Sequence, residues 1–342
     1  MLLEKLSAHL EEVKEYEREP VPASRWRGFK SFLGMYAGEH TAGTEFVIGP
    51  LFVAHGAGAM DLILGLLLGN FLAILSWAFI CAPIAVRERV TLYYLLEKIC
   101  GKHLTNAYNL VNALMFCFLA GSMIAVSATA IGIPFNIPLA KLTDWLPSGL
   151  PWIIIVVLVG TVTTFVATLG YDKVEKFSSI AAPWMILVFL AAAIAVLPEL
   201  GVKNWGDFFQ VAQDKIWTGK PLAGQSKFTF WHILFFAWFC NMAMHIGMAD
   251  MSILRYAKKW TAGFASAGGM YVGHYVAWLA SGILYALFLQ QSNENLEFAP
   301  GPVAYSAVGI TGAICVIIAG WTTANPTIYR AGLALQAIMP KA

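Results

Sequence analysis

The segment from residue 31 to residue 54 is long enough to cross a membrane, yet it carries ionisable side chains at its centre. It reads SFLGMYAGEHTAGTEFVIGPLFVA, with Glu39, His40 and Glu45 in the middle. A charge at mid-bilayer costs roughly 3 kcal/mol on insertion scales, so it persists where it faces a cavity, an ion or a partner. Unwound backbone at membrane depth is tolerated only around such a site. Three glycines could open the helix there: Gly34, Gly38 and Gly43. The segment therefore predicts an interrupted helix that binds a solute inside the membrane.

The composition places the whole chain in the membrane. Of 342 residues, 58% are hydrophobic and 12% are charged, against about 25% charged in soluble domains. A membrane span needs about 20 apolar residues, and eight such segments are present. We predict spans at roughly 31–54, 60–86, 106–132, 150–171, 177–198, 229–254, 262–290 and 302–334. The chain then divides into a polar segment (1–30), a first five-helix repeat (31–198), a loop (199–228) and an incomplete second repeat (229–342).

The basic residues predict the orientation of these spans. With the N-terminus inside, the inner segments hold 17 of the 22 lysines and arginines, and the positive-inside rule is satisfied. The N-terminus is therefore predicted to be cytoplasmic and the loop 199–228 extracytoplasmic, with an interfacial helix in WGDFFQVAQDKIW whose aromatic residues lie at headgroup level. The inner set includes Arg330, and five of its members are interpreted as topological anchors: Arg87, Arg89, Arg255, Lys258 and Lys259.

The sixth predicted span is interrupted as the first one is. It contains Asn241, His245, Gly247 and Asp250, and two interrupted spans five helices apart are what an inverted five-plus-five repeat predicts, with the solute between the breaks. Trp238 stands near the interruption, where its ring could stack on a planar ligand. Asn241 and His245 follow on roughly the same helix face. In the third span, Phe116 is a possible second stacking plate.

The eighth predicted span offers oxygen ligands. Thr322 and Thr323 place hydroxyls at membrane depth, just before Asn325 and Pro326, and the proline frees a backbone carbonyl one turn earlier. Such oxygens suit a hard monovalent cation, although a threonine can also bond to its own helix. The carboxyls of the first span leave similar alternatives open. Each is either a neutral glutamate bonded to a neighbouring helix, or a site for a cation, a proton or a solute N–H. His40 either relays protons or bonds a nearby group.

Other functional classes find no support in the residues. No nucleotide-binding loop, HExxH or Cys–His metal cluster is present, so we expect neither an enzyme nor a nucleic-acid partner. A metal held by the acidic and histidine side chains of the first span would require that helix to unwind.

The sequence resembles the nucleobase–cation symporter family of cytosine, purine, allantoin and hydantoin permeases. The resemblance runs from about Arg27 to the last residue and is carried mainly by GWTTANPTIYRAGLAL in the eighth span. GLLLGNFLAIL in the second span and the stretch from Asp250 to Lys258 agree with it. It implies an all-α integral membrane bundle of the leucine-transporter type that works by alternating access.

The resemblance also implies roles for particular residues. Ala319, Thr322 and Thr323 match the family's sodium-binding positions, with carbonyls near Thr41 and Gly43 completing a candidate sodium site. Trp238 and Phe116 match stacking positions, and Asn325 lies close to an amide that contacts substrate. The candidate substrate-binding residues are Glu39, Thr44, Glu45, Phe116, Trp238, Asn241, His245 and Asn325.

These observations predict a secondary transporter in the cell (inner) membrane. It would carry a small planar nitrogen heterocycle, such as a nucleobase, hydantoin or allantoin, by symport with Na⁺ or H⁺. The rival predictions are the same architecture carrying an amine or amino acid, or a non-transporting truncated membrane protein. The family fold has ten core helices and usually twelve, so we expect two to four helices to be missing after Ala342 and the chain alone not to transport.

Overall fold

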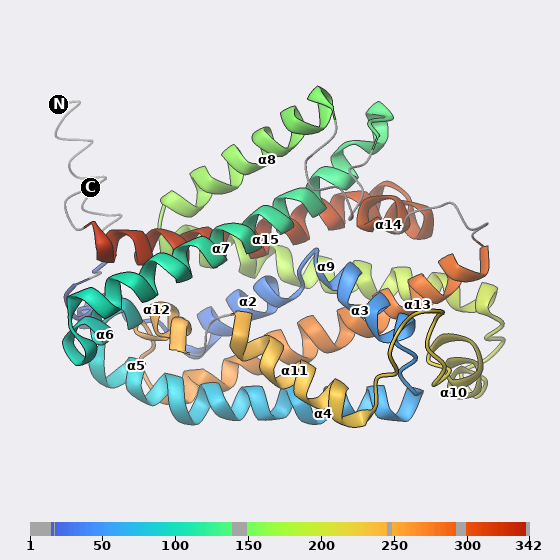
Figure 1. Ribbon diagram of the computed structural model, residues 1–342, viewed down its shortest axis with the longest axis horizontal. Helices are drawn as coiled ribbons and strands as arrows, with labels where there is room; N and C mark the ends of the chain where they lie inside the picture. Colours follow the sequence, from blue (N-terminus) through green and yellow to red (C-terminus); the bar gives the residue numbers. More distant parts are fainter. Residues whose placement is uncertain (1–14, 17, 139–148, 245–247, 292–298, 340–342) are drawn as a thin grey trace.

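The computed structural model describes residues 15–16, 18–138, 149–244, 248–291 and 299–339. Within these ranges the chain is helical, and the only extended pairings are two isolated bridges, Arg27 with Ala257 and Gly58 with Thr218. The long helices run along the long axis of the molecule, with α5, α6 and α12 at one end and α10 at the other (Figure 1). The all-helical prediction is confirmed.

The helices of the first half follow the predicted spans closely. The first span is divided into α2 (Phe29–His40) and α3 (Glu45–Ala54). The second continues from α4 (Ala59–Ser76) through a π-helical turn (Trp77–Cys81) into α5 (Ala82–Glu88). A short helix that the sequence reading did not anticipate, α6 (Leu92–Cys100), precedes α7 (Lys102–Ile131). Then follow α8 (Leu150–Thr168) and α9 (Tyr171–Leu200).

The second half contains more interruptions. The loop holds α10 (Phe208–Val211), extended by a π turn (Ala212–Ile216). The sixth span comprises α11 (Phe230–Met244), a 3-10 turn (Met248–Asp250) and α12 (Met251–Leu254). The seventh begins as a 3-10 helix (Trp260–Ala265), passes through a π helix (Gly268–Tyr275) and ends as α13 (Val276–Gln291).

The eighth span is not the single helix predicted for 302–334. It is a short helix, α14 (Pro300–Val308), followed by the long α15 (Ile310–Ile338). The chain turns at Gly309, whose φ of +65° and ψ of −146° lie in a region open almost only to glycine. The apolar pattern runs through this turn unbroken, so the sequence reading missed it.

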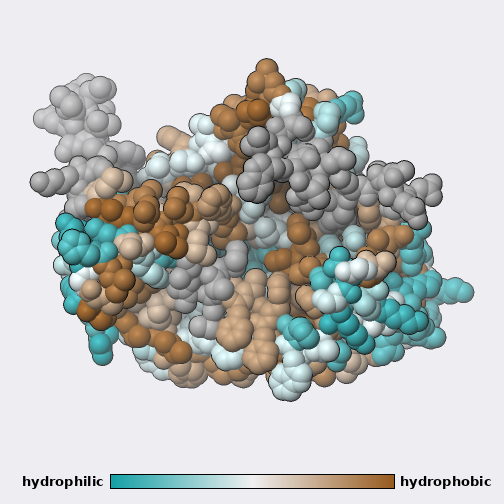
Figure 2. All heavy atoms as spheres, viewed as in Figure 1, coloured by the Kyte–Doolittle hydropathy of each residue, from teal (hydrophilic) through white to brown (hydrophobic). Residues whose placement is uncertain are grey.

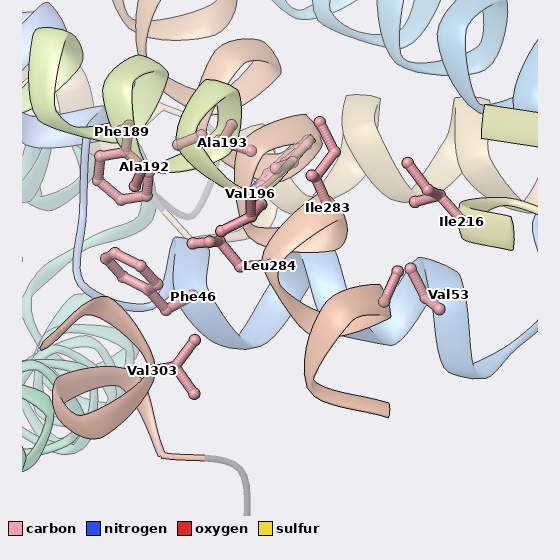
Figure 3. Close-up of a cluster of buried hydrophobic side chains, with 14 of the residues drawn as sticks. Phe46, Val53, Phe189, Ala192, Ala193, Val196, Ile216, Ile283, Leu284 and Val303 are labelled. Atoms are coloured by element: carbon pink, nitrogen blue, oxygen red, sulfur yellow. The ribbon is translucent and has the colours of Figure 1, made fainter. Parts of the chain in front are cut away.

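The helices pack closely where one of them presents a small residue. A Cβ on Gly69 of α4 would lie 2.7 Å from the Cβ of Ala237 on α11, and a Cβ on Gly38 of α2 would lie 2.6 Å from the carbonyl oxygen of Ser178 on α9. Small residues at such contacts let helix backbones approach in membranes. A larger apolar cluster joins α3, α9, α13 and α14, with the rings of Phe46 and Phe189 stacked at 4.5 Å (Figure 3).

The surface agrees with a membrane protein that has polar ends. Figure 2 shows hydrophobic side chains over the middle of the molecule on α7 and α8, and hydrophilic ones near both ends. Among the described residues, five helices are long and apolar enough to cross a membrane, and two shorter apolar helices, Glu45–Ala54 and Phe230–Asn241, belong to the interrupted spans.

The loop is partly helical, and its predicted position at the membrane interface stays a prediction. Residues 208–216 are helical, and Trp205 is exposed, but Trp217 is only 2% exposed. Its indole nitrogen lies where a Cβ on Gly282 of α13 would approach within 3.1 Å. The ring therefore fills a notch beside that glycine.

Candidate functional site

The predicted break in the first span lies where expected. Helix α2 ends at His40, α3 begins at Glu45, and the residues from Thr41 to Thr44 are not helical. Glu45 stands in the first turn of α3, where a negative charge is favoured by the helix dipole. In the sixth span, α-helix reaches Met244 and a 3-10 turn begins at Met248. His245, predicted to bind solute, lies outside the described residues.

A buried charge triad connects the two interrupted spans. The Arg330 guanidinium of α15 donates to both carboxylate oxygens of Glu39 at the end of α2, at 2.5 and 3.1 Å. It also donates to Asp250, in the 3-10 turn before α12, at 2.6 Å. The side chains of Arg330 and Asp250 are 0% exposed and that of Glu39 is 3% exposed. Two carboxylates and one guanidinium give this triad a formal charge of −1.

Arg330 is the largest correction to the sequence reading. It was expected among the inner basic residues, yet it lies fully buried in the triad. A charge count along the chain assigns each basic residue to water or headgroups and cannot detect a distant carboxylate partner. Helical spacing could have found it, because Arg330 lies seven residues after Thr323 and therefore on the same face of the helix.

Glu45 belongs to a second polar cluster, formed with the seventh span. Its carboxylate accepts a hydrogen bond from the indole N–H of Trp278 on α13 and lies 3.4 Å from Nε2 of His274 in the π helix. Its backbone oxygen accepts from the Ser281 hydroxyl at 2.6 Å. The Thr44 hydroxyl also donates to the carboxylate, at 3.3 Å. Sequence reasoning missed His274 and Trp278, although a histidine inside an apolar span is a usable signal.

His40 lies between the two clusters. Its Nδ1 is 2.9 Å from the carbonyl oxygen of Tyr36, one turn earlier on α2, and its ring centroid lies 4.5 Å from that of His274. The ring is buried among Tyr36, Trp77 and His274. His40 therefore connects the end of α2 to the π helix of the seventh span.

The candidate cation site gathers oxygens of α15 and α2. The Thr323 hydroxyl donates to the backbone oxygen of Glu39 at 2.6 Å, and the Thr322 hydroxyl donates to the backbone oxygen of Ala319 at 3.1 Å. A set of neutral hydroxyl and carbonyl oxygens suits a hard cation. The residues present therefore fit a monovalent ion. Among the described residues, no group of three or more His, Cys, Asp and Glu side chains could hold a metal.

The first-span oxygen observed there is that of Glu39 and not one from Thr41 or Gly43. The Thr41 hydroxyl donates to the backbone oxygen of Ala37, in the last turn of α2, at 2.7 Å. Gly43 packs against Val126 of α7 and the backbone of α15. The roles predicted for Thr41 and Gly43 remain predictions.

The remaining predicted residues divide between two places. Phe116 is 1% exposed and packs with Ala249 and Ala331, the chain neighbours of Asp250 and Arg330, so it borders the triad. Asn325 is also buried, and its amide oxygen has no hydrogen bond within the described part of the chain. Trp238 and Asn241 instead contact α4: Trp238 donates to Ser76 at 3.2 Å and Asn241 donates to Asn70 at 2.9 Å.

An apolar groove of about 650 Å³ lies along the face of α11. It is lined by Phe228, Trp231, His232, Phe235, Phe236, Phe239 and Cys240. Its lining contains none of the triad residues, so this groove is separate from the buried polar site.

Comparison with known proteins identifies the architecture. No family model matches the chain, and no curated protein sequence does. Among solved structures, Mhp1, described as a nucleobase-cation-symport-1 family transporter in a closed conformation with bromovinylhydantoin bound, is similar with a TM-score of 0.72. The identity is 14%, and the match covers 95% of this chain and 70% of that one. A Na⁺-coupled sialic acid symporter has a TM-score of 0.65 at 14% identity, over 99% of this chain and 72% of that one. A manganese transporter of Eremococcus coleocola has a TM-score of 0.57 at 14% identity, over 97% and 74%.

At these identities the likeness shows the fold, and the fold is the leucine-transporter type that the sequence predicts.

Proposed function

We propose that this chain forms the solute- and cation-binding part of a cation-coupled secondary transporter. The observation that carries the proposal is the Glu39–Arg330–Asp250 triad, buried where both interrupted spans meet α15. Buried charges are costly to maintain, and inside a membrane they mark solute or ion pathways. The similar solved structures include a transporter with bromovinylhydantoin bound and a Na⁺-coupled symporter, which supports this class of function.

The proposed solute is a small planar nitrogen heterocycle, bound between the breaks. Phe116 borders the triad and offers an aromatic face on which such a ring could stack. The buried amide oxygen of Asn325 can accept a hydrogen bond from a ring N–H. Trp238 would be a second aromatic ring that stacks on the solute, if its indole leaves Ser76 when the solute binds.

Glu39 couples the cation to the solute in this proposal. Its backbone oxygen faces the Thr323 hydroxyl, while its carboxylate holds Arg330. A sodium ion at the Thr322, Thr323 and Ala319 oxygens would fix the end of α2 and thereby position the triad. By linkage, sodium and solute should each raise the affinity for the other by the same factor.

Solute binding to the purified protein, measured with and without sodium, tests this proposal. Sodium should raise the affinity for a heterocycle, and Thr323→Val should weaken the apparent sodium affinity about tenfold or more, because it removes a polar ligand of a charged group. Thr161→Val is the matched control, because the Thr161 hydroxyl bonds only to its own helix on an exposed face of α8 among the described contacts. A solute affinity that sodium leaves unchanged in the unmodified protein would exclude sodium coupling and favour protons.

The charge balance favours a second candidate solute, an amine. Three buried carboxyl groups, of Glu39, Glu45 and Asp250, surround the break with one guanidinium, that of Arg330. A cationic solute would offset the excess negative charge. A thermal-shift panel of nucleobases, hydantoins and amines separates the two candidates, because only the true class of solute stabilises the folded protein in proportion to its binding.

A further inference from the structure

A segment before the first span forms a strap across one end of the helix bundle. We define this N-terminal strap as residues 15–16 and 18–28. It contacts α6, α9 and α15 and the ends of α5 and α12, at the end of the bundle where α2 begins. The carboxylate of Glu15 is its most connected group. It accepts hydrogen bonds from the Tyr329 hydroxyl on α15 at 2.6 Å, from the Tyr256 hydroxyl after α12 at 2.7 Å, and from the backbone N–H of Tyr171 at 2.8 Å.

Each of these three donors belongs to a different element. Tyr171 is the first residue of α9, so its N–H is one that no residue of the helix can satisfy, and the helix dipole favours an anion there. Burial raises the pKa of the Tyr256 hydroxyl above its usual value, so this group keeps its proton and donates at neutral pH. One carboxylate therefore joins the start of α9, the turn after α12 and α15.

The strap also satisfies a buried positive charge. The sequence reading treats Arg255 as an anchor at the membrane surface, but its side chain is 0% exposed. Its guanidinium donates to the backbone oxygens of Tyr16 at 2.7 Å, Glu15 at 2.5 Å and Ser252 at 3.0 Å. A buried guanidinium that loses its acceptors is strongly destabilised. Displacing the strap therefore changes the end of α12, and not only the strap itself.

The rest of the strap is fixed to the same end of the bundle. Arg27 exchanges backbone hydrogen bonds with the segment after α12, through Tyr256 and Lys258, at 2.7 and 3.0 Å. Its side chain donates to Asp172 of α9 at 2.6 Å. Arg18 donates to the backbone oxygen of Ala337 near the end of α15 at 2.9 Å. Because α2 starts directly after the strap, the inner halves of both interrupted spans are bound to one another.

The path from the triad to this end of the bundle is filled by side chains. Tyr36, Met251, Leu254 and Leu333 are all 2% exposed or less and pack in one apolar cluster beneath the break. A solute at the triad could leave toward this end only if α2, α12 and α15 separate. The Glu15 carboxylate holds α15 and the turn that follows α12 directly.

We propose that Glu15 is a latch that keeps this end of the bundle closed, and that its release opens the site toward the side of the N-terminus. The role in release of solute rests on the proposed transport function. The closure itself does not, because it concerns only which helices the carboxylate holds together.

Hydrogen exchange followed by mass spectrometry tests the latch. Glu15→Gln keeps the size of the side chain but removes its charge and one strong acceptor. The amides of residues 171–176 and 251–258 should then exchange about tenfold faster or more, as expected for loss of hydrogen bonds to a charged group. Asp214→Asn is the control, since it removes one carboxylate charge from an exposed position at the other end of the bundle.

A reference region at the other end of the bundle separates local release from general unfolding. There the N–H groups of Leu222 and Phe228 bond to the backbone oxygens of Ala54 and His55, after the outer half of the first span. These amides should exchange at unchanged rates in Glu15→Gln. Equal acceleration at both ends, or no acceleration at either, overturns the latch.

A double-variant comparison tests the specific partner. Tyr329→Phe removes one donor to Glu15, so Tyr329→Phe and Glu15→Gln together should accelerate exchange little more than Glu15→Gln alone. If the acceleration of exchange in the double variant equals the product of the accelerations in the two single variants, the residues act separately and the latch is refuted. If exchange responds as expected while the protein binds neither solute nor sodium, the proposed function fails and the latch stands. If solute binds and exchange does not respond, the latch alone fails.

Discussion

Removing the positive charge of Arg330 should destabilise the protein more than any other single change at the break. Arg330→Met keeps an unbranched side chain of similar length but leaves Glu39 and Asp250 without their shared guanidinium. Three hydrogen bonds of 2.5, 3.1 and 2.6 Å are lost, and the formal charge of the triad changes from −1 to −2. Breaking a buried ion pair by removing one partner costs about 3–5 kcal/mol. We expect the free energy of unfolding to fall by at least that amount.

Two other variants of the triad should lower the free energy of unfolding by smaller amounts. Glu39→Gln leaves the Arg330–Asp250 pair intact, removes the excess negative charge and keeps an acceptor oxygen. It should therefore cost about 1.5–3 kcal/mol, the range of one hydrogen bond to a charged group. Arg330→Lys keeps the charge but cannot donate a fork of two bonds to Glu39 while also reaching Asp250, so its effect should lie between the other two.

Unfolding in detergent micelles by titration with a denaturing detergent measures these differences, with tryptophan fluorescence as the signal. Arg87→Met is the control. Arg87 pairs with Glu88 at 2.8 Å, but its side chain is 81% exposed, and such surface pairs contribute less than about 1 kcal/mol. If Arg330→Met lies within about 1 kcal/mol of the unmodified protein, or if Glu39→Gln is equally damaging, the buried triad does not stabilise the break as argued.

Three further outcomes can be checked in the same assay. Gly38→Ala should lower the free energy of unfolding by about 1–3 kcal/mol, because its Cβ would lie 2.6 Å from the carbonyl oxygen of Ser178. Gly121 lies on α7, and a Cβ there would have no neighbouring atom within 4 Å, so Gly121→Ala should instead stabilise the protein by up to about 1 kcal/mol. Trp278→Phe removes the N–H donor of Glu45 and should cost about 1–3 kcal/mol, and an unchanged unfolding curve would mean that Glu45 finds another donor.

The sequence located the break in the first span because the signal there is local. Glycines and ionisable residues inside one apolar run indicate an interruption wherever the rest of the chain lies, and the structure ends α2 at His40 and begins α3 at Glu45. The polar residues of α15 stand out for the same reason, since Thr322 and Thr323 are adjacent to each other within an apolar run.

The contact between Glu39 and Arg330 could not be predicted from the local sequence. Each charge is visible in the sequence, but their 291-residue separation is bridged only by the packing of α2 against α15. Counting basic residues by segment places Arg330 at the membrane surface, whereas a carboxylate within hydrogen-bond distance lets it stay buried. The turn at Gly309 escaped notice for a related reason: glycine is common in membrane helices, and only the packing of α14 beside α15 requires it to take a positive φ.

By itself, then, the sequence determined the membrane environment, the helical class and the residues at which the first span opens. These depend on the free energy of transferring each segment from water to lipid, which is a sum over neighbouring residues. Only the tertiary structure decided which charges neutralise one another, which glycines are contact points and which end of the bundle the N-terminal strap closes. Those depend on distances of a few ångströms between residues far apart in the chain, and electrostatic and packing energies fall steeply over such distances.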